Sequence, residues 1–196
     1  MSEIGLERRI KMLEDRAEIQ NLVARYGFLI DDREMDGVAQ CFTVDGGFSS
    51  REGKLGAHGR QAVVDQFHDR WSVLGPSNHI VHQHVIDLDL ADPDRATGIV
   101  SSHAELIRNG EVWITALRYD DVYRREEGRW CFADRMLSVF YYLRPEDYVG
   151  RFGDVMRNLT YEQPYPAAIP EALPSYRAYY EAHPPAGHEM AERASS

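Results

Sequence analysis

The chain has 196 residues, a formal net charge of −10 and a sequence pI of about 5.2. An acidic chain argues against nucleic acid and anionic membrane as main partners, because both bind basic surfaces. Cys41 and Cys131 lie far apart and form no CxxC motif, which favours a reducing compartment. The sequence shows neither a signal peptide nor the roughly 18 apolar residues of a membrane span. We therefore expect a cytoplasmic protein.

The most regular pattern in the first half of the chain lies in RAEIQNLVARYGFLIDD, residues 16–32. Its apolar residues recur three and four positions apart, as on one face of a helix: Ile19, Leu22, Val23 and Tyr26. The pattern predicts a helix over residues 3–30, which could be interrupted near residues 13–15. Two carboxylates, Asp31 and Asp32, follow and lie either in solvent or in a site. A buried carboxylate costs several kcal/mol unless it is paired, so a buried one is either satisfied or functional.

The pattern then changes from helices to strands. A short helix at 38–42, a short strand at 48–51 and a helix at 60–71 come before the change. From residue 78 the apolar period is about 2, and turn sequences such as Asn109-Gly110 separate four strands: 79–90, 95–108, 112–125 and 129–142. Helices followed by antiparallel strands predict an α+β fold, in which a curved antiparallel sheet wraps on the N-terminal helices. We expect a cone with a pocket at its mouth.

The composition changes near the end, where residues 144–196 hold seven of the nine prolines and a cluster of tyrosines. We expect one α+β barrel domain over residues 1–145 and an irregular extension over residues 146–196. The extension would pack on the domain or on a neighbouring subunit, as a lid or an exchange arm. Short helices are predicted at 151–159 and 173–182, and we expect disorder in about the last ten residues.

Histidines are dense in the sequence HIVHQH and shortly after it. On a regular strand, His82 and His84 share one face, while His79 faces the other way. Together with His103 and Glu105 they could bind one metal ion, because imidazole is the commonest transition-metal ligand. The spacing matches no tight metal motif, so we expect no metal and at least two of these histidines on a solvated face.

A second interpretation pairs Asp31 with His79. A carboxylate that accepts a hydrogen bond from one imidazole nitrogen fixes the tautomer and makes the other nitrogen a better base. Such a base can take a proton next to a carbonyl or from another activated carbon. Tyr26 lies five residues before Asp31 at the same helix end, and its hydroxyl could polarise a carbonyl or protonate a leaving oxygen.

Three runs of this chain resemble the SnoaL-like branch of the nuclear transport factor 2-like superfamily: RAEIQNLVARYGFLIDDREMDGVAQCF, NHIVHQHVIDLD and YDDVYRREEGRWCFADRMLSVFYY. That branch holds scytalone dehydratase, the bile-acid 7α-dehydratases and hexachlorocyclohexane dehydrochlorinase, and the resemblance covers about residues 8–145. It implies a cone-shaped α+β fold, no cofactor, and a homo-oligomer that is a trimer or, second, a dimer. It also implies that Asp31 and His79 form the proton-abstracting base, assisted by Tyr26.

The groups that handle the leaving group differ from those relatives. Where the steroid dehydratases carry a further Asp, this chain has Ser102, His103 and Ala104. Their late Arg falls near Val139, with only Arg135 close by. We expect substrate contacts from a polar and aromatic set: His103, Trp71, Tyr119, Arg135 and Phe48.

These features predict a cofactor-independent lyase, either a dehydratase or a retro-aldol-type carbon–carbon lyase, or an isomerase. Its substrate would be a hydrophobic aromatic or polycyclic small molecule. The alternatives are a non-catalytic ligand-binding or assembly module of the same fold, and a structural protein similar to a dioxygenase small subunit. A separation beyond about 4 Å between Asp31 and His79 would favour the binding module.

Overall fold

The computed structural model describes residues 5–184 of the chain. It begins with one continuous helix, α1 (Leu6–Asp32), followed by the short helix α2 (Met35–Gln40). The expected interruption near residues 13–15 is absent. Asp15 is buried within the helix, where its carboxylate accepts hydrogen bonds from Trp130 Nε1 at 3.1 Å and from Arg125. No helix within residues 5–184 combines the length and the apolar character needed to cross a membrane.

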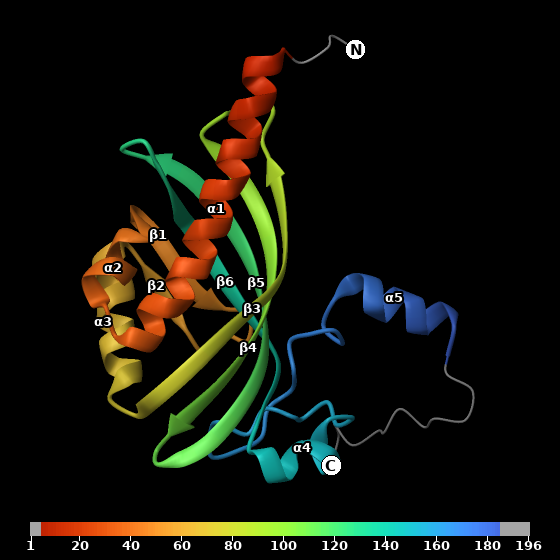
Figure 1. Cartoon of the computed structure of the whole chain (residues 1–196). Helices are drawn as coiled ribbons and strands as arrows, with labels where there is room; N and C mark the ends of the chain where they lie inside the picture. Colours follow the sequence, from red (N-terminus) through yellow and green to blue (C-terminus); the bar gives the residue numbers. More distant parts are fainter. Residues whose placement is uncertain (1–4, 185–196) are drawn as a thin grey trace.

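Six strands form a single curved sheet in the order β2-β1-β6-β5-β4-β3, which stays open rather than closing into a barrel (Figure 1). Their bounds are β1 (Phe42–Ser50), β2 (Gly56–His58), β3 (Leu74–Leu88), β4 (Arg95–Arg108), β5 (Glu111–Glu126) and β6 (Arg129–Leu143). The last four make the predicted antiparallel meander. β1 adds to it by pairing parallel to β6, and β2 pairs antiparallel to β1. The predicted α+β fold is confirmed.

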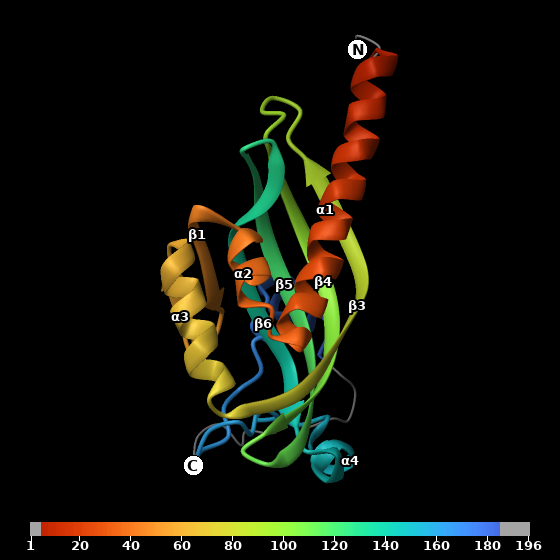
Figure 2. The same cartoon turned by 60° about the vertical axis from the view of Figure 1, so that its left-hand side comes forward.

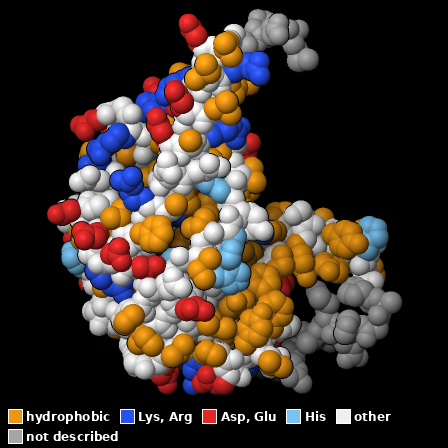
Figure 3. All heavy atoms as spheres, in the orientation of Figure 1, with side chains coloured by type: hydrophobic (Ala, Val, Ile, Leu, Met, Phe, Trp, Pro, Cys, Tyr) orange, Lys and Arg blue, Asp and Glu red, His pale blue; other side chains and the backbone are white. Residues whose placement is uncertain are grey.

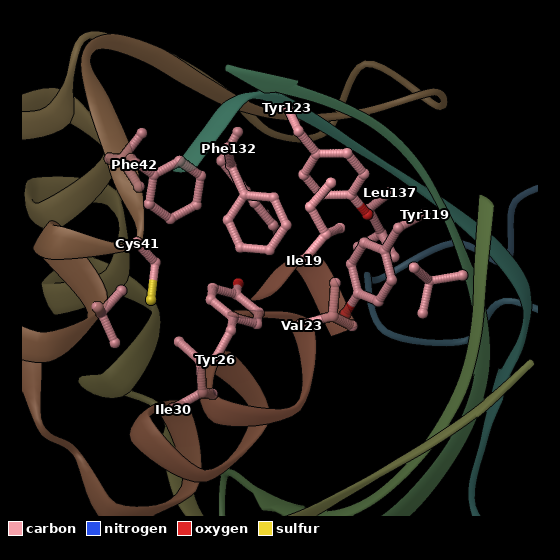
Figure 4. Close-up of a cluster of buried hydrophobic side chains, with 14 of the residues drawn as sticks. Ile19, Val23, Tyr26, Ile30, Cys41, Phe42, Tyr119, Tyr123, Phe132 and Leu137 are labelled. Carbon is pink, nitrogen blue, oxygen red and sulfur yellow. The ribbon is translucent and has the colours of Figure 1, made fainter. Parts of the chain in front are cut away.

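The helices α1, α2 and α3 (Arg60–Trp71) all lie on one side of the sheet, within its curvature (Figures 1 and 2). The core forms between them and is rich in aromatic rings. Tyr26 from α1 points toward the sheet, and its ring centroid lies 5.5 Å from that of Phe132 (Figure 4). Phe42 from β1 lies 5.3 Å from Phe132 in the same cluster. Burial of this apolar stripe of α1 fixes where the C-terminal end of the helix meets the sheet.

A β-bulge in β3 decides which histidines face the helices. Val81 pairs with Ser102, whereas His84 pairs with Val100, so β3 carries one extra residue at this point. His79 and His84 therefore lie on the helix-covered face, while His82 is exposed on the other. The expectation that His82 and His84 share a face is wrong, because the bulge shifts the alternation by one residue.

The C-terminal extension begins with a 3-10 turn (Pro145–Asp147) and α4 (Tyr148–Arg151), and it contains α5 (Pro174–Ala182). The helix predicted at 151–159 is wrong. α4 ends at Arg151, and the carboxylate of Asp154 then accepts the backbone N–H of Met156 at 2.9 Å, which favours a turn. The disorder expected for about the last ten residues lies outside the described residues, and the domain boundary at residue 145 stays a prediction.

Buried Arg157 anchors the extension to β6. Its guanidinium donates to both carboxylate oxygens of Glu171 at 2.7 and 2.8 Å. It also donates to the backbone carbonyls of Phe140 at 2.6 Å and Ile169 at 2.8 Å. The segment around residue 160 is thereby held against the sheet.

Candidate active site

The carboxylate of Asp31 joins the end of α1 to β3. Its Oδ1 accepts from the ring Nδ1 of His79 at 2.6 Å and from the hydroxyl of Ser77 at 2.7 Å. Its Oδ2 accepts from the backbone N–H of His79 at 2.7 Å. With Nδ1 donating to the carboxylate, the ring's Nε2 is left as the proton acceptor.

These contacts also set the charge of Asp31. Burial raises the pKa of this carboxyl, but the hydrogen bonds from the ring and backbone of His79 and from Ser77 outweigh it, so the pKa of Asp31 is lowered. The group is therefore an anion at neutral pH, where it stabilises a protonated imidazole. The neighbouring Asp32 is exposed, so the two carboxylates at the helix end have separate surroundings.

Arg33 fixes the end of α1. It adopts a left-handed backbone conformation, with φ of 63°, that terminates the helix. Its guanidinium donates to the backbone carbonyls of Ile30, at 2.5 Å, and of Gly75, and it lies 3.2 Å from the hydroxyl of Ser77. The helix end and the start of β3 are thus clamped together where Asp31 meets His79.

His79 lines a pocket enclosed by the helices, the sheet and the extension. The pocket has an empty volume of about 900 Å³, which includes open solvent at its mouth. Five residues expected at the site line it: Tyr26, Phe48, Trp71, His79 and Tyr119. A pocket that is mostly apolar and contains a few polar groups is typical of a small-molecule site.

Tyr26 reaches the pocket from α1, two turns before the helix ends. Its side chain is buried, and burial raises the pKa of its hydroxyl well above the ordinary value. Tyr119 is buried beside it, and burial likewise raises the pKa of Tyr119. Both hydroxyls therefore keep their protons at neutral pH and can donate hydrogen bonds to an oxygen in the pocket.

Arg135 does not line the pocket, which corrects its expected place among the substrate contacts. It is 1% exposed and lies in the core, with its guanidinium carbon 3.9 Å from the ring centroid of Tyr119 and 4.5 Å from that of Tyr26. Its Nε lies 3.6 Å from Oδ1 of Asp121. Burial raises the pKa of Asp121 to about 6, although the nearby guanidinium acts in the opposite direction. The guanidinium of Arg135 therefore packs against the rings of Tyr26 and Tyr119 from within the core.

Hydrogen bonds connect Asp121 to two further polar side chains, Tyr123 and His84. The hydroxyl of Tyr123 donates to Oδ2 of Asp121 at 2.8 Å, and His84 Nε2 lies 3.0 Å from the same hydroxyl. Burial lowers the pKa of His84 to about 4, and Arg135 acts in the same direction. His84 is therefore a neutral partner inside the fold at neutral pH.

His103 also lies outside the pocket, since residues alternate across β4 and its neighbour Ala104 is the one that faces inward. It is exposed on the opposite face, where its Nδ1 lies 2.7 Å from Nε2 of His82. Figure 3 shows histidine side chains at this surface next to a gathering of hydrophobic ones. Because His84 faces inward, the alternative in which His82, His84 and His103 share one metal ion is excluded by the geometry. Within residues 5–184 no three His, Cys, Asp or Glu side chains group in a way that could hold a metal ion.

The sequence model of the SnoaL-like domain matches residues 11–136, which is more than half of the chain. The chain belongs to the SnoaL-like family. No curated protein matches it.

Several solved structures of other proteins have a similar fold. A putative scytalone dehydratase from Novosphingobium aromaticivorans is 20% identical, with a TM-score of 0.63 over 69% of this chain and 91% of that chain. The hexachlorocyclohexane dehydrochlorinase LinA-type3 from Novosphingobium barchaimii is 20% identical, with a TM-score of 0.62 over 69% and 93%. A protein of unknown function from Mycobacterium tuberculosis is 27% identical, with a TM-score of 0.57 over 74% and 81%.

Several pocket residues were missed by the sequence analysis. Ser77 lies two positions before His79 on one strand face, so strand alternation was a usable signal for it. Tyr161 and Tyr165 reach the pocket from the extension, where no periodic pattern indicates it. Arg70 and Arg108 come from the ends of α3 and β4, and only the folded chain brings both to the wall of this pocket.

Proposed function

We propose that this protein is a cofactor-independent lyase that eliminates water from a hydrophobic aromatic or polycyclic small molecule. The observation that carries the proposal is the 2.6 Å hydrogen bond between His79 Nδ1 and Asp31 at the wall of the pocket. It leaves Nε2 as the basic nitrogen of a histidine that lines the pocket.

The reaction follows from these positions. Nε2 of His79 takes a proton from the carbon next to a carbonyl, and the electron pair of that C–H bond forms a C=C bond as the C–O bond to the leaving hydroxyl breaks. The anion of Asp31 stabilises the protonated ring. The departing hydroxide takes a proton and leaves as water. The imidazolium returns that proton directly, or Tyr26 donates it and is then reprotonated by the imidazolium. If His79 takes the proton of a β-hydroxyl group instead, the same base drives a retro-aldol carbon–carbon cleavage. If His79 takes the carbon-bound proton and returns it to another carbon of the substrate, the reaction is an isomerisation.

Two arguments favour catalysis over simple binding. A non-catalytic module has no need to hold Asp31 and His79 together, whereas their atoms lie well within the 4 Å limit. Proteins with the same fold are described as a dehydratase and a dehydrochlorinase, both of which remove a proton and a leaving group.

The test is turnover of a panel of aromatic alcohols and β-hydroxy ketones. We expect His79→Ala to lower kcat by about 10²- to 10⁴-fold, the usual range for loss of a general base. His82→Ala is the matched control, because His82 lies on the opposite face of the same strand and should keep full activity. Full activity of the His79→Ala variant on a substrate of the wild type would contradict the proposal.

We also propose that the protein is a cytoplasmic homo-oligomer, a trimer or, second, a dimer. Sedimentation velocity of the purified chain gives its mass in solution. A monomer across the micromolar range would contradict this proposal without affecting the assignment of the base.

A further inference from the structure

We propose that the substrate is an organic anion, and that its acidic group binds a cationic cluster in the pocket. The cluster consists of four side chains: Arg33, Lys54, Arg70 and Arg108. The inference rests on the proposed function, because it takes the pocket beside His79 as the substrate site.

The sign of the charge in the pocket is opposite to that of the whole chain. The chain carries a net charge of −10, yet its pocket is lined by these four cations and by a single carboxylate, Glu52. The carboxylate of Glu52 already accepts a hydrogen bond from the backbone N–H of Val139 at 2.8 Å. A cationic recess in an acidic protein attracts anions selectively.

No carboxylate within residues 5–184 lies within 4.0 Å of any charged nitrogen of the cluster. The contrast with other arginines is clear, since Arg60, Arg124 and Arg125 each have an acidic partner. The side chains of Arg70 and Lys54 donate no hydrogen bond to another described residue. Within the cluster, the negative charge of Asp31 acts on Arg33. Cations that share a partly enclosed space repel one another, and an anion placed between them relieves that repulsion.

The charge of Arg70 acts inside the pocket. Burial raises the pKa of the pocket tyrosines Tyr26, Tyr119 and Tyr142, while Arg70 acts on each of them in the opposite direction. Arg108 acts in the same way on Tyr142. Both guanidinium groups are therefore close to groups that line the cavity, and a guanidinium can bind a carboxylate through two parallel hydrogen bonds.

Arg33 and Lys54 each lie against aromatic rings that line the pocket. The guanidinium carbon of Arg33 lies 5.0 Å from the ring centroid of Trp71. The ammonium of Lys54 lies 5.1 Å and 5.4 Å from the ring centroids of Tyr161 and Tyr165 in the extension. The cluster thus combines positive charge with flat apolar surfaces, which suits an aromatic acid.

The strand register gives the distance from Arg108 to the base, whereas Arg33 lies close to the base, 3.2 Å from the Ser77 hydroxyl that donates to Asp31. Leu74 pairs with Arg108 at one end of the β3–β4 ladder, and His79 pairs with Ala104. Four residues of β4 separate the two pairs, which corresponds to about 13 Å along the strand. The inward-facing residue between them is Leu106, which is buried and lines the pocket. A substrate whose acidic group binds at the Arg108 end of the cluster is therefore an elongated apolar acid, with its anionic group roughly 10 Å from the carbon that loses the proton.

The test uses two probes of equal shape, 2-naphthoate and the neutral 2-naphthamide, with binding measured by isothermal titration calorimetry. We expect the wild-type protein to bind naphthoate about tenfold more tightly than naphthamide, and the difference to shrink as salt is added. The double variant Arg70→Gln/Arg108→Gln should lose about 10- to 100-fold of its naphthoate affinity and none of its naphthamide affinity.

Two further variants make the result specific. Arg70→Lys/Arg108→Lys keeps the charge and should recover part of the naphthoate affinity, which separates a charge effect from damage to the fold. Arg118→Gln, at a position that does not line the pocket, should change neither affinity. Equal affinity of the wild type for the two probes, undetectable naphthoate binding, or equal losses for both probes in the glutamine double variant would overturn the inference.

The outcomes also separate this inference from the proposed function. His79→Ala should abolish elimination and leave naphthoate binding intact. Preference for naphthoate in a protein without any lyase activity would refute the proposed function and keep the anion site. Lyase activity that depends on His79, in a protein that binds the two probes equally, would refute the anion site and keep the proposed function.

Discussion

The carboxylate of Asp31 accepts two hydrogen bonds from one residue, His79, through the ring Nδ1 at 2.6 Å and the backbone N–H at 2.7 Å. The hydrogen bond from the backbone N–H fixes the position of β3 relative to the end of α1, and the hydrogen bond from the ring orients the imidazole. One carboxylate at a helix end therefore controls both the position and the tautomer of a histidine that is 48 residues further along the chain.

Replacement of Asp31 by Asn should lower kcat by about 10²- to 10⁴-fold, because the amide removes the negative charge that stabilises the protonated ring and no longer enforces one tautomer. It should also lower the free energy of unfolding by about 1–3 kcal/mol, since a part-buried hydrogen-bonded charge is lost. Steady-state kinetics and urea denaturation measure the two effects.

The control for that variant is Asp32→Asn. Asp32 is the adjacent residue and is exposed, so its replacement should alter neither the rate nor the stability. Equal effects of the two substitutions would show that the charge at the helix end matters rather than the contact with His79.

Stability should depend on pH through His84. Burial lowers the pKa of His84 from 6.5 to about 4 in the folded protein, so the unfolded chain binds a proton there at a higher pH than the folded chain does. The free energy of unfolding therefore decreases as the pH falls from about 6.5 to about 4. Asp121 acts in the opposite direction over part of this range, because its folded pKa of about 6 exceeds its ordinary value.

His84→Gln isolates the first contribution. The amide can still meet the hydroxyl of Tyr123, but it does not titrate. Chemical denaturation between pH 4 and pH 7 should show that the variant loses less stability than the wild type as the pH falls, and that His82→Gln behaves as the wild type does. Parallel pH profiles for the wild type and His84→Gln would contradict the assignment.

The C-terminal extension should act as part of the pocket wall. Thr160, Tyr161 and Tyr165 line the pocket, so Tyr161→Ala/Tyr165→Ala should raise KM several-fold while leaving the fold intact. Tyr179→Ala is the control, because Tyr179 is 59% exposed on α5. Deletion of residues 160–196 should open the pocket or change the oligomer, and unchanged activity together with an unchanged mass would refute both roles.

Much of the fold follows from local patterns in the sequence. Helix α3 matches the predicted residues 60–71, because its apolar stripe is complete within twelve residues. The strands β4, β5 and β6 lie within one residue of their predicted bounds, because turn sequences delimit them. The pairing of Asp31 with His79, which the sequence predicts, is a hydrogen bond of 2.6 Å in the structure.

What the sequence left open depends on pairing between distant segments. The bulge in β3 is defined by its register against β4, and no local pattern in HIVHQH indicates it. The resemblance places Arg135 in the pocket because it is the arginine near the position of the relatives' late Arg. In the structure the aromatic rings of Tyr26 and Tyr119 and the carboxylate of Asp121 accommodate it in the core. The cationic cluster is likewise assembled from four separate segments of the chain.

Hydrogen–deuterium exchange at a carbon next to a carbonyl tests the central claim most directly, because it needs a base but no leaving group. The α-hydrogens of 1-tetralone would be followed by NMR in D₂O with wild-type protein, His79→Ala and His82→Ala. The account predicts exchange above the solvent background with wild type and His82→Ala, and background exchange with His79→Ala. Exchange by His79→Ala at the wild-type rate would show that another group is the base.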